Sequence, residues 1–121
     1  MTTINLPRQL TSMLFSVATV WLLAIAGGSA AAQTVDAAAA ESLAKKSKCT
    51  TCHSVDKAKD GPSYKEIAAK YKGKPDAAQK LFTHLTTNQK VKIDGKEETH
   101  EGPKTKNDAE IKNLVAWVLS R

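Results

Sequence analysis

The chain has 121 residues, a formal net charge of +6 at pH 7 and an aromatic content of only 5%. Its many lysines have no interleaved aromatic residues, which argues against nucleic-acid binding. The export signal described in the next paragraph argues against it as well. It has two cysteines, too few for a zinc site that needs a second cysteine pair.

Residues 1–32 have the pattern of a cleaved secretory signal peptide. Arg8 is the only charged residue in this segment, an apolar stretch of 14 residues runs from Met13 to Ala26, and an Ala-x-Ala site precedes Gln33. A membrane-spanning helix needs about 20 apolar residues, so cleavage is favoured over a retained anchor. We therefore expect export to a bacterial periplasm and no stable membrane insertion after cleavage.

The first helix is predicted from about Asp36 to Lys48, leading directly into the cysteine pair. Asp36 is a favourable N-cap, residues 37–40 are all alanine, and Leu43 with Ala44 would form the inward face.

The pentapeptide Cys49-Thr50-Thr51-Cys52-His53 has the spacing of a c-type haem attachment site. Two thiols three positions apart can each add to one vinyl group of a porphyrin, and the adjoining His53 can then bind the iron. A dithiol redox pair would need a βαβ context, which is missing. We therefore predict one haem c, attached covalently through Cys49 and Cys52, with His53 as an iron ligand.

Cleavage would leave residues 33–121, a single domain of 89 residues with a formal charge of about +5, because Arg8 is removed. A domain this small, with few aromatic residues, has a thin hydrophobic core. We expect the apoprotein to be largely unfolded and haem attachment to drive its folding.

Two more helices are expected after a loop at residues 54–62. The second helix, at 63–72, is predicted to end at Gly73 as its C-cap. The third is predicted from Pro75-Asp76 to about Asn88. Their expected inward-facing residues are Ile67, Ala68 and Tyr71, and then Ala77, Ala78, Leu81 and Leu85.

The stretch 91–106 is mostly polar, and its first five residues, Val91 to Gly95, could start a tight hairpin. The last helix is predicted to begin at Asn107, with Glu110 completing a capping-box pattern. Its apolar stripe is Ile111, Leu114, Val115 and Val118.

Over essentially all of residues 33–121, this sequence resembles the monohaem class I cytochrome c family of bacterial periplasmic type. The segments that carry the resemblance are the haem motif, Gly61-Pro62-Ser63-Tyr64-Lys65, Ala69-Lys70-Tyr71-Lys72-Gly73 and Leu114-Val115-Ala116-Trp117-Val118-Leu119-Ser120.

The resemblance implies an all-α fold of about four helices around one haem, whose first and last helices cross and whose haem edge is exposed. It also implies that the Pro62 carbonyl accepts a hydrogen bond from the free ring nitrogen of His53. The aromatic residue that the family usually has on its first helix is replaced by Leu43-Ala44. We interpret Trp117 as a core residue.

The sixth iron ligand departs from the resemblance. Family members of high potential use a methionine before the last helix, whereas Met1 and Met13 are the only methionines here and both lie in the leader. His100 stands close to the expected position, seven residues before Asn107, and is the predicted ligand. His84, a loop lysine, Asn107 or an open site remain alternatives.

Bis-histidine ligation would lower the reduction potential, because a thioether favours ferrous iron more than imidazole does. We predict a low-potential electron carrier and not an enzyme, since no paired carboxylates accompany the histidines. The alternatives are a haem protein that binds or senses NO, CO or sulfide, and a haem subunit of a larger periplasmic oxidoreductase.

Lysines flank the haem motif and follow the proposed ligand segment. In the resembled fold they would surround the exposed haem edge and attract redox partners with an acidic docking face. A generally lysine-rich surface is the alternative. These residues are Lys45, Lys46, Lys48, Lys57, Lys59, Lys104 and Lys106.

Overall fold

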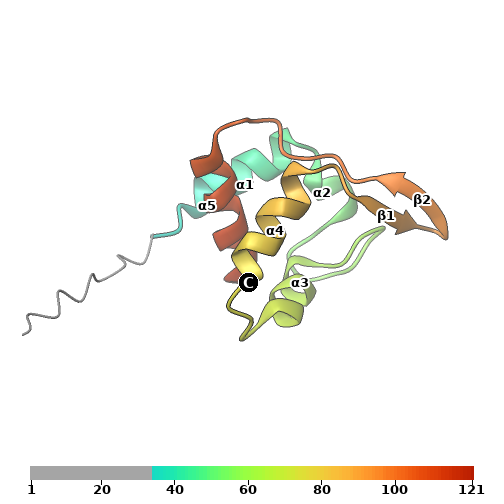
Figure 1. Cartoon of the computed structure of the whole chain (residues 1–121), viewed down its shortest axis with the longest axis horizontal. Coiled ribbons are helices and arrows are strands. Elements are labelled where there is room, and N and C mark those ends of the chain that lie inside the picture. Colours follow the sequence, from blue (N-terminus) through green and yellow to red (C-terminus); the bar gives the residue numbers. More distant parts are fainter. Residues whose placement is uncertain (1–33) are drawn as a thin grey trace, which may run out of the picture. The chain divides into compact units, whose positions relative to one another are not determined.

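The computed structural model describes residues 34–121, so the predicted leader lies outside the described residues. The elements, in chain order, are α1 (Ala37–Lys46), α2 (Cys49–Cys52), α3 (Tyr64–Tyr71), α4 (Ala77–Thr86), β1 (Lys90–Ile93), β2 (Lys96–Thr99) and α5 (Asp108–Leu119). Helices dominate, as predicted, and a small hairpin is added (Figure 1). Within residues 34–121, no helix has the length and apolar character needed to cross a membrane.

The last helix, α5, is the centre of the packing and contacts α1, α3 and α4. Its predicted stripe is buried, with Ile111, Leu114 and Val115 each only 3% exposed, and it meets Ala40 and Ala44 of α1, each 1% exposed. Burial of these apolar side chains is the main favourable contribution to the fold.

A polar contact fixes the N-terminal start of α1 against α5. The Asp36 N–H donates to Asn113 Oδ1 at 2.9 Å, and Asn113 Nδ2 donates to the Asp36 carbonyl at 2.8 Å. The Asp36 side chain caps α1 by accepting from the Ala39 N–H, as its N-cap prediction requires.

Trp117 is a core residue, 2% exposed, as predicted. Its ring meets the Tyr64 ring edge-on at a centroid distance of 5.1 Å. This aromatic pair joins α5 to α3 and supplies much of the packing that a small core needs.

Several helix boundaries and contacts differ from the predictions. The first helix ends at Lys46, because Lys48 adopts a left-handed conformation (φ 60°) that turns the chain into α2. Ala78 was predicted to face inward, and this is wrong: only Ala77 and Leu81 of α4 are buried.

The capping-box prediction for α5 is also wrong. The Asn107 N–H donates to Thr105 Oγ1, so Glu110 instead accepts from the Asn107 side-chain amide at 3.5 Å. A complete capping box occurs at the start of α3, between Ser63 and Glu66.

The hairpin predicted from Val91 to Gly95 is present and projects from the helical body (Figure 1). Asp94 and Gly95 both have positive φ, 49° and 78°, as a type I′ turn requires. The register pairs Lys90 with Thr99, so the residue that follows the hairpin is His100.

Candidate haem site

The two cysteines lie at the ends of the single-turn helix α2, Cys49–Cys52. Residues at i and i+3 of a helix share a face, so both thiols are placed on the same side of this turn. Both cysteines are free and partly exposed. Burial raises the pKa of the Cys49 thiol, so this thiol is held in its protonated form at neutral pH.

His53 ends this turn, with its N–H bonded to the Cys49 carbonyl at 3.0 Å. Its Nδ1 lies 2.6 Å from the Pro62 carbonyl oxygen. A carbonyl only accepts, so Nδ1 carries the proton and donates, which leaves Nε2 with the free lone pair that a metal needs. The ring also stacks on Tyr64 at 5.7 Å.

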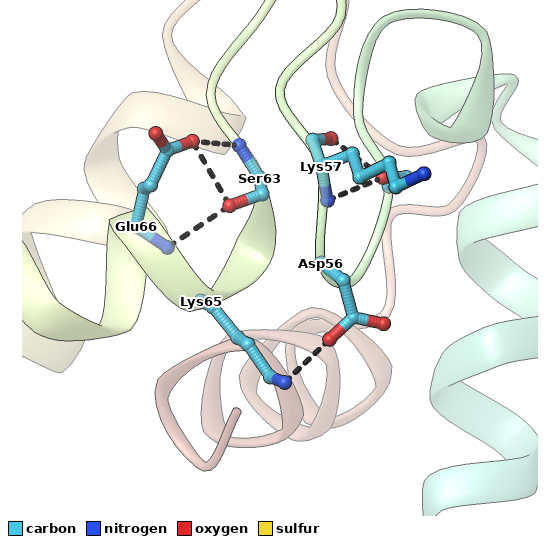
Figure 2. A network of polar contacts seen from close by, with 6 residues as sticks. Asp56, Lys57, Ser63, Lys65 and Glu66 are labelled. Atoms are coloured by element: carbon cyan, nitrogen blue, oxygen red, sulfur yellow. Dashed lines mark hydrogen bonds and ion pairs between the residues drawn. The ribbon is translucent and has the colours of Figure 1, made fainter.

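The loop that presents Pro62 is held by a polar network (Figure 2). Asp56 pairs with Lys65, and the Ser63 capping box with Glu66 fixes the start of α3. The Gly61 N–H also donates to the Cys52 carbonyl at 3.0 Å. The loop is therefore tied both to α3 and to the end of the haem motif.

Gly61 is required for the close approach of this loop to His53. A Cβ at this position would lie 2.7 Å from His53 Cε1 and 3.0 Å from Nδ1. The sequence contains the Gly-Pro pair, but the reason for its glycine is visible only in three dimensions.

His100 lies across from His53, although 47 positions separate them in the chain. The two ring centroids are 6.1 Å apart and the ring planes are inclined by 55°. Two imidazoles bound to opposite sides of one metal, with metal–nitrogen distances of about 2.0 Å, would have centroids roughly 6 Å apart. The centroid separation is therefore compatible with two imidazoles that bind one metal ion.

Burial is the main cause that lowers the pKa of His100, followed by the nearby charges of His84 and His53. A lowered pKa keeps the ring neutral at neutral pH, and the neutral imidazole is the form that binds metal. His100 Nδ1 is buried and has no hydrogen-bond partner.

These residues fit a haem. Two thiols on one helical turn could form the thioethers, and the imidazoles of His53 and His100 could supply nitrogen ligands to the haem iron. A cavity of about 280 Å³ adjoins His53 on the side of Ala44, Tyr64 and Trp117; neither the cysteines nor His100 line it.

The other candidates for the sixth ligand have different surroundings. His84 lies 4.5 Å from His100, centroid to centroid, and its Nδ1 is 3.1 Å from Gln89 Oε1. The Asn107 side chain accepts the Ala109 N–H as the cap of α5. Lys104 and Lys106 are exposed.

Gly102 was not singled out from the sequence, yet it sets the position of the segment that carries His100. A Cβ here would lie 2.3 Å from the Leu85 carbonyl oxygen, far inside van der Waals contact. The backbone after His100 therefore packs directly on the last turn of α4. The adjoining Pro103 is the only local signal of a fixed turn.

The lysines that flank the site are all exposed: Lys45, Lys46, Lys48, Lys57, Lys59, Lys104 and Lys106. Lys59 Nζ donates to the Thr50 carbonyl at 2.8 Å, inside the haem motif. Exposed lysines therefore lie on both sides of the cysteine pair in the chain, together with the exposed acids Asp56 and Asp60.

The family model described as Cytochrome c matches residues 37–121. The chain is 42% identical over 81 residues to cytochrome c-551 of Allochromatium vinosum, covering 64% of this chain and 80% of that protein. It is 39% identical over 94 residues to cytochrome c-551 of Stutzerimonas stutzeri, covering 78% of this chain and 88% of that protein.

Two solved structures are similar. The class 1 cytochrome MtoD from Sideroxydans lithotrophicus ES-1 shares 52% identity with a TM-score of 0.69, covering 71% of this chain and 96% of that one. Cytochrome c552 of Nitrosomonas europaea shares 34% identity with a TM-score of 0.53, covering 66% and 96%.

Proposed function

Because the chain belongs to the monohaem class I cytochrome c family, we propose that it is a low-potential electron carrier whose haem iron is ligated by His53 and His100. The family carries one covalently attached haem c, and Cys49 and Cys52 fit its attachment motif. When bound, this group supplies one-electron redox chemistry. The protein's residues hold it, orient it and set its potential.

The observation that carries the proposal is the 6.1 Å separation of the His53 and His100 rings. Met1 and Met13, the only methionines, both lie in the segment interpreted as a leader. No methionine is therefore present in residues 34–121 to act as the second protein ligand, and His100 is the histidine that the structure places beside His53.

Two axial imidazoles lower the potential relative to a histidine–methionine pair, because the thioether favours the ferrous state. For a one-electron couple, each tenfold change in relative affinity for the two oxidation states shifts the potential by about 59 mV. A six-coordinate iron is also closed to substrates. Both properties suit a carrier of single electrons and not an enzyme.

The lysines around the motif suit docking to an acidic face of a redox partner. Opposite charges accelerate encounter and are screened by salt. We propose that the carrier works in the periplasm, reached through cleavage of residues 1–32, and exchanges electrons there with such partners.

The test is the optical and EPR spectrum of the ferric holoprotein beside His100→Ala and His84→Ala. We expect a low-spin wild type without a sulfur-to-iron charge-transfer band, a high-spin His100→Ala, and a low-spin His84→Ala. A low-spin His100→Ala would refute His100 as ligand. A high-spin wild type would instead favour the binding of a small ligand at an open iron.

A further inference from the structure

One ring nitrogen of His100 would remain without a role when the other binds the proposed iron. If Nε2 binds the iron, the remaining ring nitrogen, Nδ1, must carry the proton, and this atom is buried without a partner. Histidine ligands almost always donate this proton to an acceptor, which fixes the ring and raises its basicity. His53 already does so through Pro62, whereas His100 lacks an equivalent.

His84 is the side chain placed to accept that proton. Its ring lies 4.5 Å from the His100 ring, centroid to centroid, with the planes inclined by 46°. An N–H···N bond between two imidazoles places their centroids roughly 5 Å apart. The observed separation is close to this value, but the structure has no hydrogen bond between the two rings, so they must reorient to form one.

Gln89 fixes which nitrogen of His84 is available. Its Oε1 lies 3.1 Å from His84 Nδ1, and an amide oxygen only accepts. His84 Nδ1 must therefore donate, and in the neutral ring Nε2 keeps the free lone pair. The Gln89 backbone carbonyl also accepts the His100 N–H at 2.8 Å, so one residue holds both histidines.

We propose that His84 is a positioning residue for the sixth ligand, in a hydrogen-bonded chain from His100 Nδ1–H to His84 Nε2 and from His84 Nδ1–H to Gln89 Oε1. This proposal rests on ligation by His100. It assigns His84 to the support of the iron ligand and not to the iron itself. By making His100 a stronger donor, the chain stabilises the ferric state and lowers the potential further.

The test compares His84→Phe with His84→Gln in the holoprotein. Phenylalanine fills the space without an acceptor, whereas the glutamine Oε1 can replace Nε2. We expect His84→Phe to stay low-spin and to change its ferric EPR g-values. We also expect the preference for the ferric over the ferrous state to fall about tenfold, which raises the reduction potential by about 59 mV. We expect His84→Gln to recover most of that shift. Gln79→Leu, which changes another residue of α4 lining the same surface pocket as His84, is the matched control and should leave the potential unchanged.

Equal potentials in wild type and His84→Phe would overturn the inference, and so would equal shifts in the two His84 variants, which would indicate packing alone. If His84→Phe fails to bind haem, Gln89→Leu provides the second test. It should raise the potential in the same direction by a smaller amount, and an unchanged potential would refute the chain. A low-spin His100→Ala would defeat the proposed function itself, whereas these results at His84 would leave ligation by His100 intact.

Discussion

The backbone N–H of Lys104 donates a 2.8 Å hydrogen bond to Oγ of Ser47. Ser47 is buried, 6% exposed, and caps the end of α1 just before the haem motif. The bond therefore ties the segment carrying His100 to the segment carrying the cysteines. It connects residues that are 57 positions apart in the chain.

Ser47→Ala should loosen this connection. The Lys104 N–H would lose its partner in a partly buried place, at a cost of about 1–3 kcal/mol in the free energy of unfolding. Denaturant unfolding of the holoprotein measures this loss. Ser42→Ala changes an exposed serine of the same helix and should stay within about 0.5 kcal/mol of wild type. Equal stability of the two variants would contradict the role given to Ser47.

Gly102→Ala should displace the ligand segment, because the new Cβ would lie 2.3 Å from the Leu85 carbonyl oxygen. The backbone after His100 must move away from α4, and the iron–imidazole bond should weaken. We expect a larger high-spin fraction in the ferric spectrum and faster binding of added cyanide. Gly95→Ala, in the exposed hairpin turn, would strain the backbone without touching the site. It is expected to leave the spectrum unchanged.

Gly61→Ala should disturb His53, the other proposed iron ligand. Its Cβ would press on the His53 ring at 2.7 Å and so lengthen the bond from His53 Nδ1 to the Pro62 carbonyl. A weaker second-sphere bond makes the imidazole a poorer donor, so the reduction potential should rise. Potentiometric titration measures it. The control is Gly73→Ala, which strains the backbone (φ 74°) but brings no atom within 4 Å of the new Cβ. A potential equal to wild type would count against the contact.

Tyr64 should make the fold sensitive to alkali. Burial, and secondarily the charge of Cys49, raises the pKa of Tyr64 to about 12; in the haem protein the Cys49 charge is removed by thioether formation and burial remains. The unfolded phenol titrates near 10. Between these two pKa values the folded state binds more protons than the unfolded state. The contribution of Tyr64 to the free energy of unfolding is therefore fully present below about pH 10 and is lost as the pH rises toward 12.

Thermal unfolding from pH 9 to 12 measures this dependence. Wild type should lose at most roughly 2–3 kcal/mol of its free energy of unfolding across this pH range because of Tyr64. Tyr64→Phe should not show this loss. Tyr71→Phe should keep it, because Tyr71 is only partly buried. Identical pH profiles for wild type and Tyr64→Phe would exclude Tyr64 as the cause.

The basic surface should control reactions with charged redox reagents. Oxidation of the ferrous protein by the anion ferricyanide should slow as ionic strength rises, because salt screens the attraction. The double variant Lys57→Glu, Lys59→Glu places negative charge near the site, so its oxidation by ferricyanide should be slower than that of wild type. Its rate should rise, and not fall, as ionic strength increases. The control is the double variant Lys74→Glu, Lys112→Glu. It changes the net charge by the same amount, but at positions after α3 and on α5. If both pairs behave alike, net charge and not a local docking face governs the rate.

Local sequence signals predicted much of this protein correctly. The predicted apolar stripe at Ile111, Leu114 and Val115 is buried. Asp94-Gly95 forms the turn of the predicted hairpin. Each signal acts over a few residues, through helix periodicity or the backbone freedom that a tight turn needs. The haem motif is of the same kind, since its chemistry depends on a spacing of three residues.

The sequence also indicated His100 as a candidate ligand, but only because it lies shortly before the last helix, seven residues before Asn107. Which group faces His53 is decided by contacts between distant segments: the Gln89 carbonyl on the His100 N–H, Gly102 against Leu85, and Ser47 on Lys104. The same holds for the failed capping box, where Thr105 took the bond expected of Glu110. The sequence alone therefore determined the cofactor and the helices, because short-range spacing encodes them. The tertiary structure decided that His100 lies beside His53, because this proximity depends on hydrogen bonds and close backbone approaches between residues far apart in the chain.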